Sequence, residues 1–440
     1  MLSPGNHPRA RIRAAAGRYR EARQSLRSPT STRSRHGLDW TNFFIADVQT
    51  GFGSFVAFYL AHLGWSQGNV GLALAVGTIA GVVSQIPGGA LADAVTWKRG
   101  LVAIGIGMVG TAALILALKP DFPWVFVAEV FQGSTGGIIT PAIASISLGL
   151  VGRQAMSLRT GRNYRFSAGG NALTAGLMGL AGTYLSDAAI FFSAAALCIP
   201  ALIALSTVRG EEIDYAKARN AVAGKKTVDS ARILDLAKNR RLILFAGALM
   251  LFQLADASML PLVGENLAKS GSNGTPLWMS GLIVAPQIVV ALLAPWVGFH
   301  SEKRGRLPLL LIGFAMEPIR AGILAITAYY PFLVAGQVLD GISGATVGVL
   351  TIIVITDLTA GTGRFNLAIG AIGALNGIAA AISTSTTGFL FQHFGPHIGR
   401  SPSSAPLPLE WCGCSCRRRS PRNTRIEASR RRSAIGASRS

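Results

Sequence analysis

The chain has 440 residues, of which 50 % are apolar and only 14 % are charged, whereas about 25 % of the residues in soluble domains are charged. This composition excludes an ordinary soluble domain and favours a membrane protein. The formal net charge is +21, but the Arg-rich tails at residues 1–38 and 395–440 hold +16 of it. The excess of positive charge therefore does not indicate a nucleic-acid-binding groove across the fold.

Apolar stretches long enough to cross a bilayer follow one another along the chain. A hydrocarbon core of about 30 Å needs roughly 20 mostly apolar residues per helix, and eleven stretches reach that length. They lie at 39–61, 67–92, 100–118, 123–150, 165–186, 188–208, 241–264, 277–299, 307–328, 331–357 and 366–390. The sequence therefore predicts an all-α membrane protein with eleven spans.

The order of these spans predicts five regions. They are a basic disordered N-terminal tail at 1–38, a six-helix half at 39–208, a cytoplasmic linker at 209–240, a half of five spans at 241–394 and an Arg-, Ser-, Pro- and Cys-rich tail at 395–440. No apolar run after Gly395 is long enough for a twelfth span. Because an odd number of spans would carry the basic tail across the membrane, we expect residues from about 398 onward to be foreign to the fold, as after a change of reading frame.

The basic residues of the loops are distributed very unequally between the two sides of the membrane. Loops on the side of the N-terminus carry nineteen Lys and Arg residues, whereas the opposite loops carry only Lys119 and Lys269. Positively charged loops stay in the cytoplasm. We therefore expect a multi-pass protein of the inner (plasma) membrane with a cytoplasmic N-terminus.

The two halves resemble each other in sequence. I-A-D at 45–47 recurs as L-A-D at 254–256, an offset of 209 residues, and the stretch that begins at Gly89 recurs from Gly298 at the same offset. Parallel six-helix repeats joined by a long cytoplasmic loop are typical of one class of secondary transporters.

On these features the chain resembles the major facilitator superfamily over residues 39 to about 394. That family carries the pattern G-x-L-x-D-R-x-G-R-K after its second span and again after its eighth. The first copy is matched by Gly89, Leu91, Asp93 and Lys98, and the second by Gly298, Glu302, Lys303, Gly305 and Arg306. The resemblance implies that these two loops are gating loops, which hold one face of the transporter closed.

A second family pattern, R-x-x-Q-G in the fourth span, reads Glu129-Val-Phe-Gln132-Gly133 in this chain. The resemblance implies that the Arg of this pattern assists coupling in proton-driven exporters, and here a Glu replaces it. The Gly-Pro-rich pattern of antiporters is also missing from the fifth span. The direction of transport therefore stays open at this point.

Ionisable groups inside the predicted spans are candidate substrate or coupling residues, since a carboxylate at mid-bilayer costs roughly 2.5–3.5 kcal/mol. Glu317 and Arg320 share a helix face and favour a self-neutralising pair, while for Asp340 a packing role and a transport role both stay open. Asp47 and Asp256 lie in the first span of each half with no cation within a turn on the same helix, and we favour a functional role for them. The full set, with two nearby amides, is Asp47, Glu129, Gln132, Asp256, Glu317, Arg320, Gln337 and Asp340.

Together these features predict a secondary transporter that moves a small organic solute by alternating access between two halves, with proton-coupled efflux as one form. Uptake of a nutrient, siderophore or osmolyte, or a truncated non-transporting membrane protein, are the alternatives. The expected partners are the solute, protons and the lipid bilayer, for a monomer that binds no nucleic acid. Since no catalytic motif or metal-ligand cluster lies in the predicted body, we expect neither an enzyme nor a metal nor a cofactor.

Overall fold

The computed structural model of the protein describes residues 31–50, 56, 57, 59, 60, 62–221, 236–261, 263, 275–326 and 329–398. Residues 399–440, nearly all of the segment expected to be foreign to the fold, lie outside the described residues.

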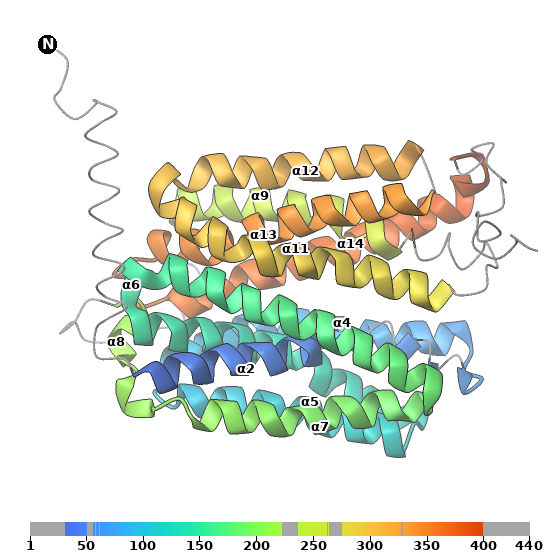
Figure 1. The fold of residues 1–440 in the computed structure, drawn as a ribbon, viewed down its shortest axis with the longest axis horizontal. Helices are drawn as coiled ribbons and strands as arrows, with labels where there is room; N and C mark the ends of the chain where they lie inside the picture. The colour runs from blue at the N-terminus through green and yellow to red at the C-terminus, as the bar shows by residue number, and fades with distance from the viewer. Residues whose placement is uncertain are drawn as a thin grey trace, which may run out of the picture. The chain divides into compact units, whose positions relative to one another are not determined.

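The described residues are almost entirely helical, as Figure 1 shows. The N-terminal half contains α2 (Thr32–Thr50), α4 (Gln67–Ala94), α5 (Lys98–Leu118), α6 (Phe122–Tyr184) and α7 (Asp187–Ser206). A 3-10 turn (Gly210–Glu212) and α8 (Tyr215–Ala218) follow in the linker. The C-terminal half contains α9 (Arg240–Asp256), α11 (Thr275–Arg304), α12 (Arg306–Ile326), α13 (Tyr330–Leu358) and α14 (Phe365–Ile398). Nine of the described helices are long and apolar enough to cross a membrane.

Helix α6 joins two of the predicted spans. Its 63 residues cover both 123–150 and 165–186, and the loop expected between them is helical as well. Gly152 has φ 69° and ψ 176°, outside the helical region, a conformation that glycine tolerates because it lacks a Cβ. This kink divides α6 into two segments and places Arg159 and Arg162 on a helix instead of in an open loop.

The difference between nine candidate helices and eleven predicted spans has two local causes. Helix α6 counts once although it covers two predicted spans, and the first predicted span, 39–61, is described only in part beyond Thr50. Each of the other predicted spans overlaps one of the helices between α4 and α14.

Sequence signals at the helix ends explain several boundaries. Ser66 precedes α4 and Ser186 precedes α7, and each side-chain oxygen accepts a hydrogen bond from the backbone N–H three residues on, which is the usual N-cap arrangement. At the other end of α4, the buried Lys98 donates a hydrogen bond to the carbonyl oxygen of Ala92, where the helix dipole favours a cation. The contact between Lys98 and Ala92 holds the short connection between α4 and α5.

The two largest hydrophobic cores among the described residues correspond to the two halves of the chain. The first includes Leu38 of α2 and Phe191 of α7, and the second includes Leu350 of α13 and Phe365 of α14. Leu148 of α6 belongs to the second core, although most buried residues of α6 belong to the first. Helix α6 therefore packs in both halves.

The first helix begins earlier than the domain boundary predicted at residue 38. Helix α2 begins at Thr32, and just before it Ser31 donates hydrogen bonds from N and Oγ to Glu212 Oε2 at 3.0 and 3.1 Å. Burial acts to raise the pKa of Glu212, but hydrogen bonds from Ser31 and Ser34 outweigh it and lower that pKa. Residues 31–38 therefore belong to the folded body and are bonded to the start of the linker.

Candidate functional site

Four of the predicted ionisable residues meet in the C-terminal half. Arg320 of α12 lies between Asp256, the last residue of α9, and Asp340 of α13, with Glu317 one turn earlier on its own helix. Arg320 Nη1 is 2.5 Å from Asp256 Oδ1, 2.8 Å from Asp340 Oδ1 and 3.5 Å from Glu317 Oε2. Ser343 Oγ donates a hydrogen bond to Glu317 Oε1 at 2.7 Å. We call the four charged residues the Arg320 cluster.

The Arg320 cluster holds more negative than positive charge. Three carboxylates share one guanidinium, and the recorded contacts all use the same nitrogen, while Arg320 Nε has no hydrogen-bond partner among the described residues. These contacts therefore lack the bidentate fork that makes Arg–carboxylate pairs strong. Because uncompensated charge is costly to bury, the cluster favours binding of a proton or of another cation.

The members of the Arg320 cluster differ in exposure. The side chains of Arg320 and Glu317 are 2 % and 4 % exposed, whereas those of Asp256 and Asp340 are 26 % and 25 % exposed. At about 1.5 Å rise per residue, Arg320 lies about 21 Å from the start of α12 and Asp340 about 15 Å from the start of α13. The cluster thus lies well inside α12 and α13, and Asp256 and Asp340 are its more exposed members.

This geometry changes the interpretation of Asp256 and of the pair on α12. Asp256 has no cation within a turn on its own helix, as the sequence indicates, but the neighbouring helix supplies Arg320. Glu317 does not neutralise Arg320 by itself, because both aspartates lie closer to the guanidinium. Asp340, for which two roles stayed open, belongs to the same charged cluster.

Candidates in the N-terminal half are not among the residues that contact Arg320. Glu129 of α6 is buried against Gly77 of α4, where an added Cβ would lie 2.3 Å from Glu129 Oε2. Gln132 lies one turn further along α6. Asp47 lies in α2, and its side chain is outside the described residues. A joint role of Asp47 and Asp256 therefore stays a prediction.

Gln337 is a buried polar residue close to the Arg320 cluster along the chain. It lies one turn before Asp340 on α13, is 0 % exposed, and neither Oε1 nor Nε2 has a hydrogen-bond partner among the described residues. An unsatisfied buried polar group costs about 1–3 kcal/mol. The amide of Gln337 therefore keeps hydrogen-bonding capacity that no described residue uses.

The three carboxylates of the cluster are close enough to be considered as metal ligands. Oxygen atoms of Asp256, Glu317 and Asp340 lie within 4.8 Å of one another. The guanidinium of Arg320 already lies within 3.5 Å of each of them and supplies a cation at that place. A metal ion bound by all three carboxylates would have to displace Arg320, whereas a proton binds to one carboxylate without displacing it.

The first gating loop joins the two halves. Asp93, at the end of α4, is buried and accepts hydrogen bonds from the backbone N–H groups of Asn366 and Leu367, at 3.2 and 2.8 Å, and from Asn366 Nδ2 at 2.7 Å. A carboxylate is favourable at the start of a helix such as α14, where N–H groups lack helical partners. One turn earlier, an added Cβ on Gly89 would lie 2.4 Å from the carbonyl oxygen of Asn366, so only glycine allows this approach.

The second gating loop also contains a glycine at a contact between halves. An added Cβ on Gly298 would lie 2.4 Å from the carbonyl oxygen of Ser157 in α6. The other members contact their own half: Glu302 pairs with Arg306 at 3.0 Å, Lys303 Nζ lies 4.1 Å from the ring centroid of Phe299, and Gly305 has φ 88°. Both gating loops therefore lie where the halves meet, and the acid of the first loop is hydrogen-bonded to the C-terminal half.

Replacing Asp93 by Asn should weaken closure at this end, because the amide keeps only one acceptor oxygen for the two backbone N–H groups of α14. Hydrogen bonds to charged groups contribute about 1.5–3 kcal/mol. We expect a new population at longer distance between spin labels on the exposed residues Trp97 and Leu307, one in each half. Asp121→Asn is the matched control, since Asp121 is an exposed aspartate outside both loops and its side chain makes no capping hydrogen bond. An unchanged distance distribution in Asp93→Asn would contradict the gating role.

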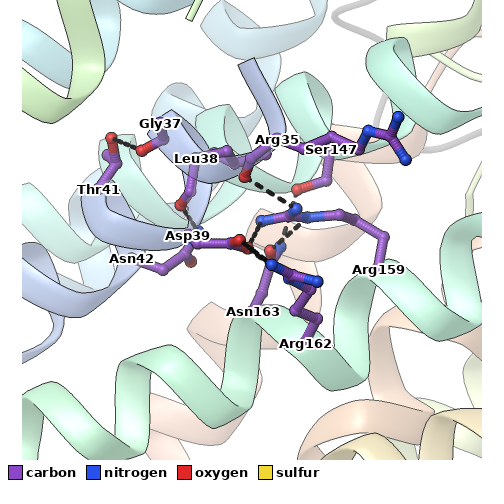
Figure 2. Close-up of polar contacts among 10 residues, drawn as sticks. All are labelled: Arg35, Gly37, Leu38, Asp39, Thr41, Asn42, Ser147, Arg159, Arg162 and Asn163. Carbon is purple, nitrogen blue, oxygen red and sulfur yellow. Dashed lines mark hydrogen bonds and ion pairs between the residues drawn. The ribbon is translucent and has the colours of Figure 1, made fainter. Parts of the chain in front are cut away.

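A second charged group was not predicted as a site. Asp39 of α2 is buried and pairs with two arginines of α6, through Arg159 Nη2 at 2.8 Å and Arg162 Nη2 at 2.5 Å (Figure 2). Arg159 also donates to Asn163 Oδ1, and Asn163 donates to Ser147 Oγ. In the sequence the two arginines count only as loop charges, and Asp39 lies more than a hundred residues away, so no local pattern reveals the contact.

The long apolar helices and the charged residues buried among them are features of a polytopic helical membrane protein. A model of the major facilitator superfamily matches residues 40–316. An uncharacterized MFS-type transporter of Mycobacterium tuberculosis is 36 % identical over 361 residues, which cover 81 % of this chain and 86 % of that protein, and the same match is found in two strains. The class D tetracycline resistance protein of Salmonella ordonez is 30 % identical over 157 residues, 31 % of this chain and 40 % of that protein.

The fold is also similar to a solved structure. The nucleoside transporter NupG, in a mutant form, superposes with a TM-score of 0.60 at 15 % sequence identity, covering 82 % of this chain and 92 % of that one. The chain belongs to the major facilitator superfamily. It is thus a multi-pass membrane transporter and not an enzyme, and the family resemblance seen in the sequence is confirmed.

Proposed function

We propose that this protein is a proton-coupled secondary transporter of a small organic solute, and that the Arg320 cluster is its coupling site. The observation that carries the proposal is the guanidinium of Arg320, well inside α12, shared by three carboxylates. A proton taken up by Asp256 or Asp340 reduces the excess negative charge, and its release restores it. The two protonation states therefore favour different arrangements of α9, α12 and α13.

The proposed direction is efflux. Support comes from the partial similarity to a protein named for tetracycline resistance. In such a cycle the Arg320 cluster binds a proton and the solute in turn, and the two halves rock about the site. A cationic solute would be recognised by the same aspartates, which are the more exposed members of the cluster.

The test first identifies a solute that binds the protein and then measures transport of that solute. A thermal-shift screen of the purified protein, starting with tetracycline and continuing through organic cations, identifies a ligand because binding to the folded state stabilises it. Flux of that compound is then followed in proteoliposomes with and without a pH gradient. Flux that depends on the gradient supports the proposal. Equal rates of flux in vesicles with and without the protein would contradict transport. Flux driven only inward would support uptake instead.

We further propose that the protein lies in the inner (plasma) membrane and crosses it eleven times. Its N-terminus then lies in the cytoplasm. The two segments of α6 and the helix α2 bring the nine candidate helices to eleven. A reporter inserted in the 209–240 linker should be cytoplasmic, and one fused at Ser440 should be outside. A cytoplasmic reporter at Ser440 would show that one proposed span does not cross.

A further inference from the structure

A cavity of about 760 Å³ lies between α2, α6 and α11, apart from the Arg320 cluster. Its volume is within the range of about 300–1,000 Å³ that is common for small-molecule sites. Four of its lining residues are arginines: Arg35 from α2 and Arg159, Arg162 and Arg165 from α6. We call it the arginine cavity.

The arginine cavity carries an excess of positive charge. No carboxylate is among the described residues that line it. Asp39, which does not line the cavity, is buried and already pairs with two of the lining arginines, Arg159 and Arg162, as Figure 2 shows. The three guanidiniums from α6, those of Arg159, Arg162 and Arg165, and this one carboxylate leave a local surplus of two positive charges. Such a surplus favours an anionic ligand, and guanidinium groups bind phosphate with good geometry.

The other lining groups of the cavity are largely apolar and aromatic. Trp40 and Phe166 lie edge to face with ring centroids 5.9 Å apart, and Phe43 lies 5.3 Å from Trp40. The guanidinium of Arg162 lies 5.6 Å from the ring centroid of Phe166. Trp40 is 47 % exposed, and exposed Trp side chains at span ends are typical of the membrane–water interface. Cationic and apolar surfaces therefore adjoin each other at the edge of the membrane.

We propose that the arginine cavity binds an anionic phospholipid, with the phosphodiester against Arg162 and Arg165 and the acyl chains along Trp40, Phe43 and Phe166. Basic pockets between membrane helices on the cytoplasmic side are typical sites for acidic lipid headgroups. A soluble anion would use the guanidiniums but would gain nothing from the aromatic wall. Ala291 and Pro295 of α11 complete the wall, so the bound lipid contacts residues from both halves.

The proposal is tested by lipid titration of the full-length protein in neutral detergent. Phosphatidylglycerol should raise the thermal unfolding midpoint of the wild type, and phosphatidylcholine at the same concentration should not. In the Arg162→Gln/Arg165→Gln variant we expect the affinity for phosphatidylglycerol to fall about tenfold or more, because charge-assisted hydrogen bonds are lost. Arg159 is kept so that Asp39 retains a partner.

Arg153→Gln is the matched control, since it removes the same charge from the same helix but Arg153 does not line the cavity. It should keep the wild-type response. Inorganic phosphate at millimolar concentration should not reproduce the shift. An equal response of the double variant and the wild type, an equal effect of phosphatidylcholine, or a full shift with inorganic phosphate would each overturn the lipid site. If the double variant does not fold, Arg165→Gln alone is titrated, and an undiminished affinity there overturns the contact with Arg165.

Discussion

Replacing Asp340 by Asn should give a folded, inserted protein that has lost coupled transport. Asparagine has nearly the same volume and still offers an oxygen to Arg320, whose Nη1 lies 2.8 Å from the carboxylate. It cannot take up a proton, so the cluster loses a group that changes charge during the cycle. Flux driven by a pH gradient in proteoliposomes should fall about tenfold or more, as expected for loss of a charge-assisted interaction.

Asp256→Asn should behave in the same way, because Asp256 shares the same guanidinium nitrogen. Asp121→Asn is the control: Asp121 is an exposed aspartate before α6 whose side chain makes no capping hydrogen bond. The variants are compared at equal amounts of protein with equal melting temperatures. If Asp340→Asn and Asp256→Asn transport at the wild-type rate with the same pH dependence, the Arg320 cluster is not the coupling site, and Glu129 becomes the next residue to test.

Replacing Arg320 by Gln should destabilise the protein strongly. Arg320 is 2 % exposed and is the cation recorded beside Asp256, Glu317 and Asp340. Removal of one partner of a buried ion pair costs about 3–5 kcal/mol, because the remaining charges are left uncompensated. We expect a clear fall in the melting temperature at neutral pH, measured on the purified protein in detergent.

The loss in Arg320→Gln should be smaller at acidic pH, where protonated carboxylic acids no longer need a cation. A second change, Asp256→Asn in the same chain, should also restore part of the stability, since interacting residues show non-additive effects. Arg153→Gln removes an exposed arginine of α6 and should leave the melting temperature nearly unchanged. Additive losses in the double variant would contradict a direct electrostatic coupling.

Much of the fold is determined by the sequence itself. Runs of about 20 apolar residues predict membrane helices because an unpaired backbone cannot be buried in lipid, and each predicted span from 67–92 onward overlaps a described helix. The repeat at an offset of 209 residues locates both gating loops. The family resemblance follows from these two features, and the comparisons confirm it. The kink at Gly152 and the early start of α2 at Thr32 were not predicted.

Only the tertiary structure decides which charges meet. The sequence indicates that Asp256, Glu317, Arg320 and Asp340 lie inside the membrane, but the contact of Asp256 with Arg320 joins residues 64 positions apart. The pairing of Asp39 with Arg159 and Arg162 likewise joins α2 to α6. The physical reason is that helices apolar on nearly all faces carry little periodicity. Which face of each helix turns toward a neighbour is then set by packing across the whole bundle, and no local pattern records it.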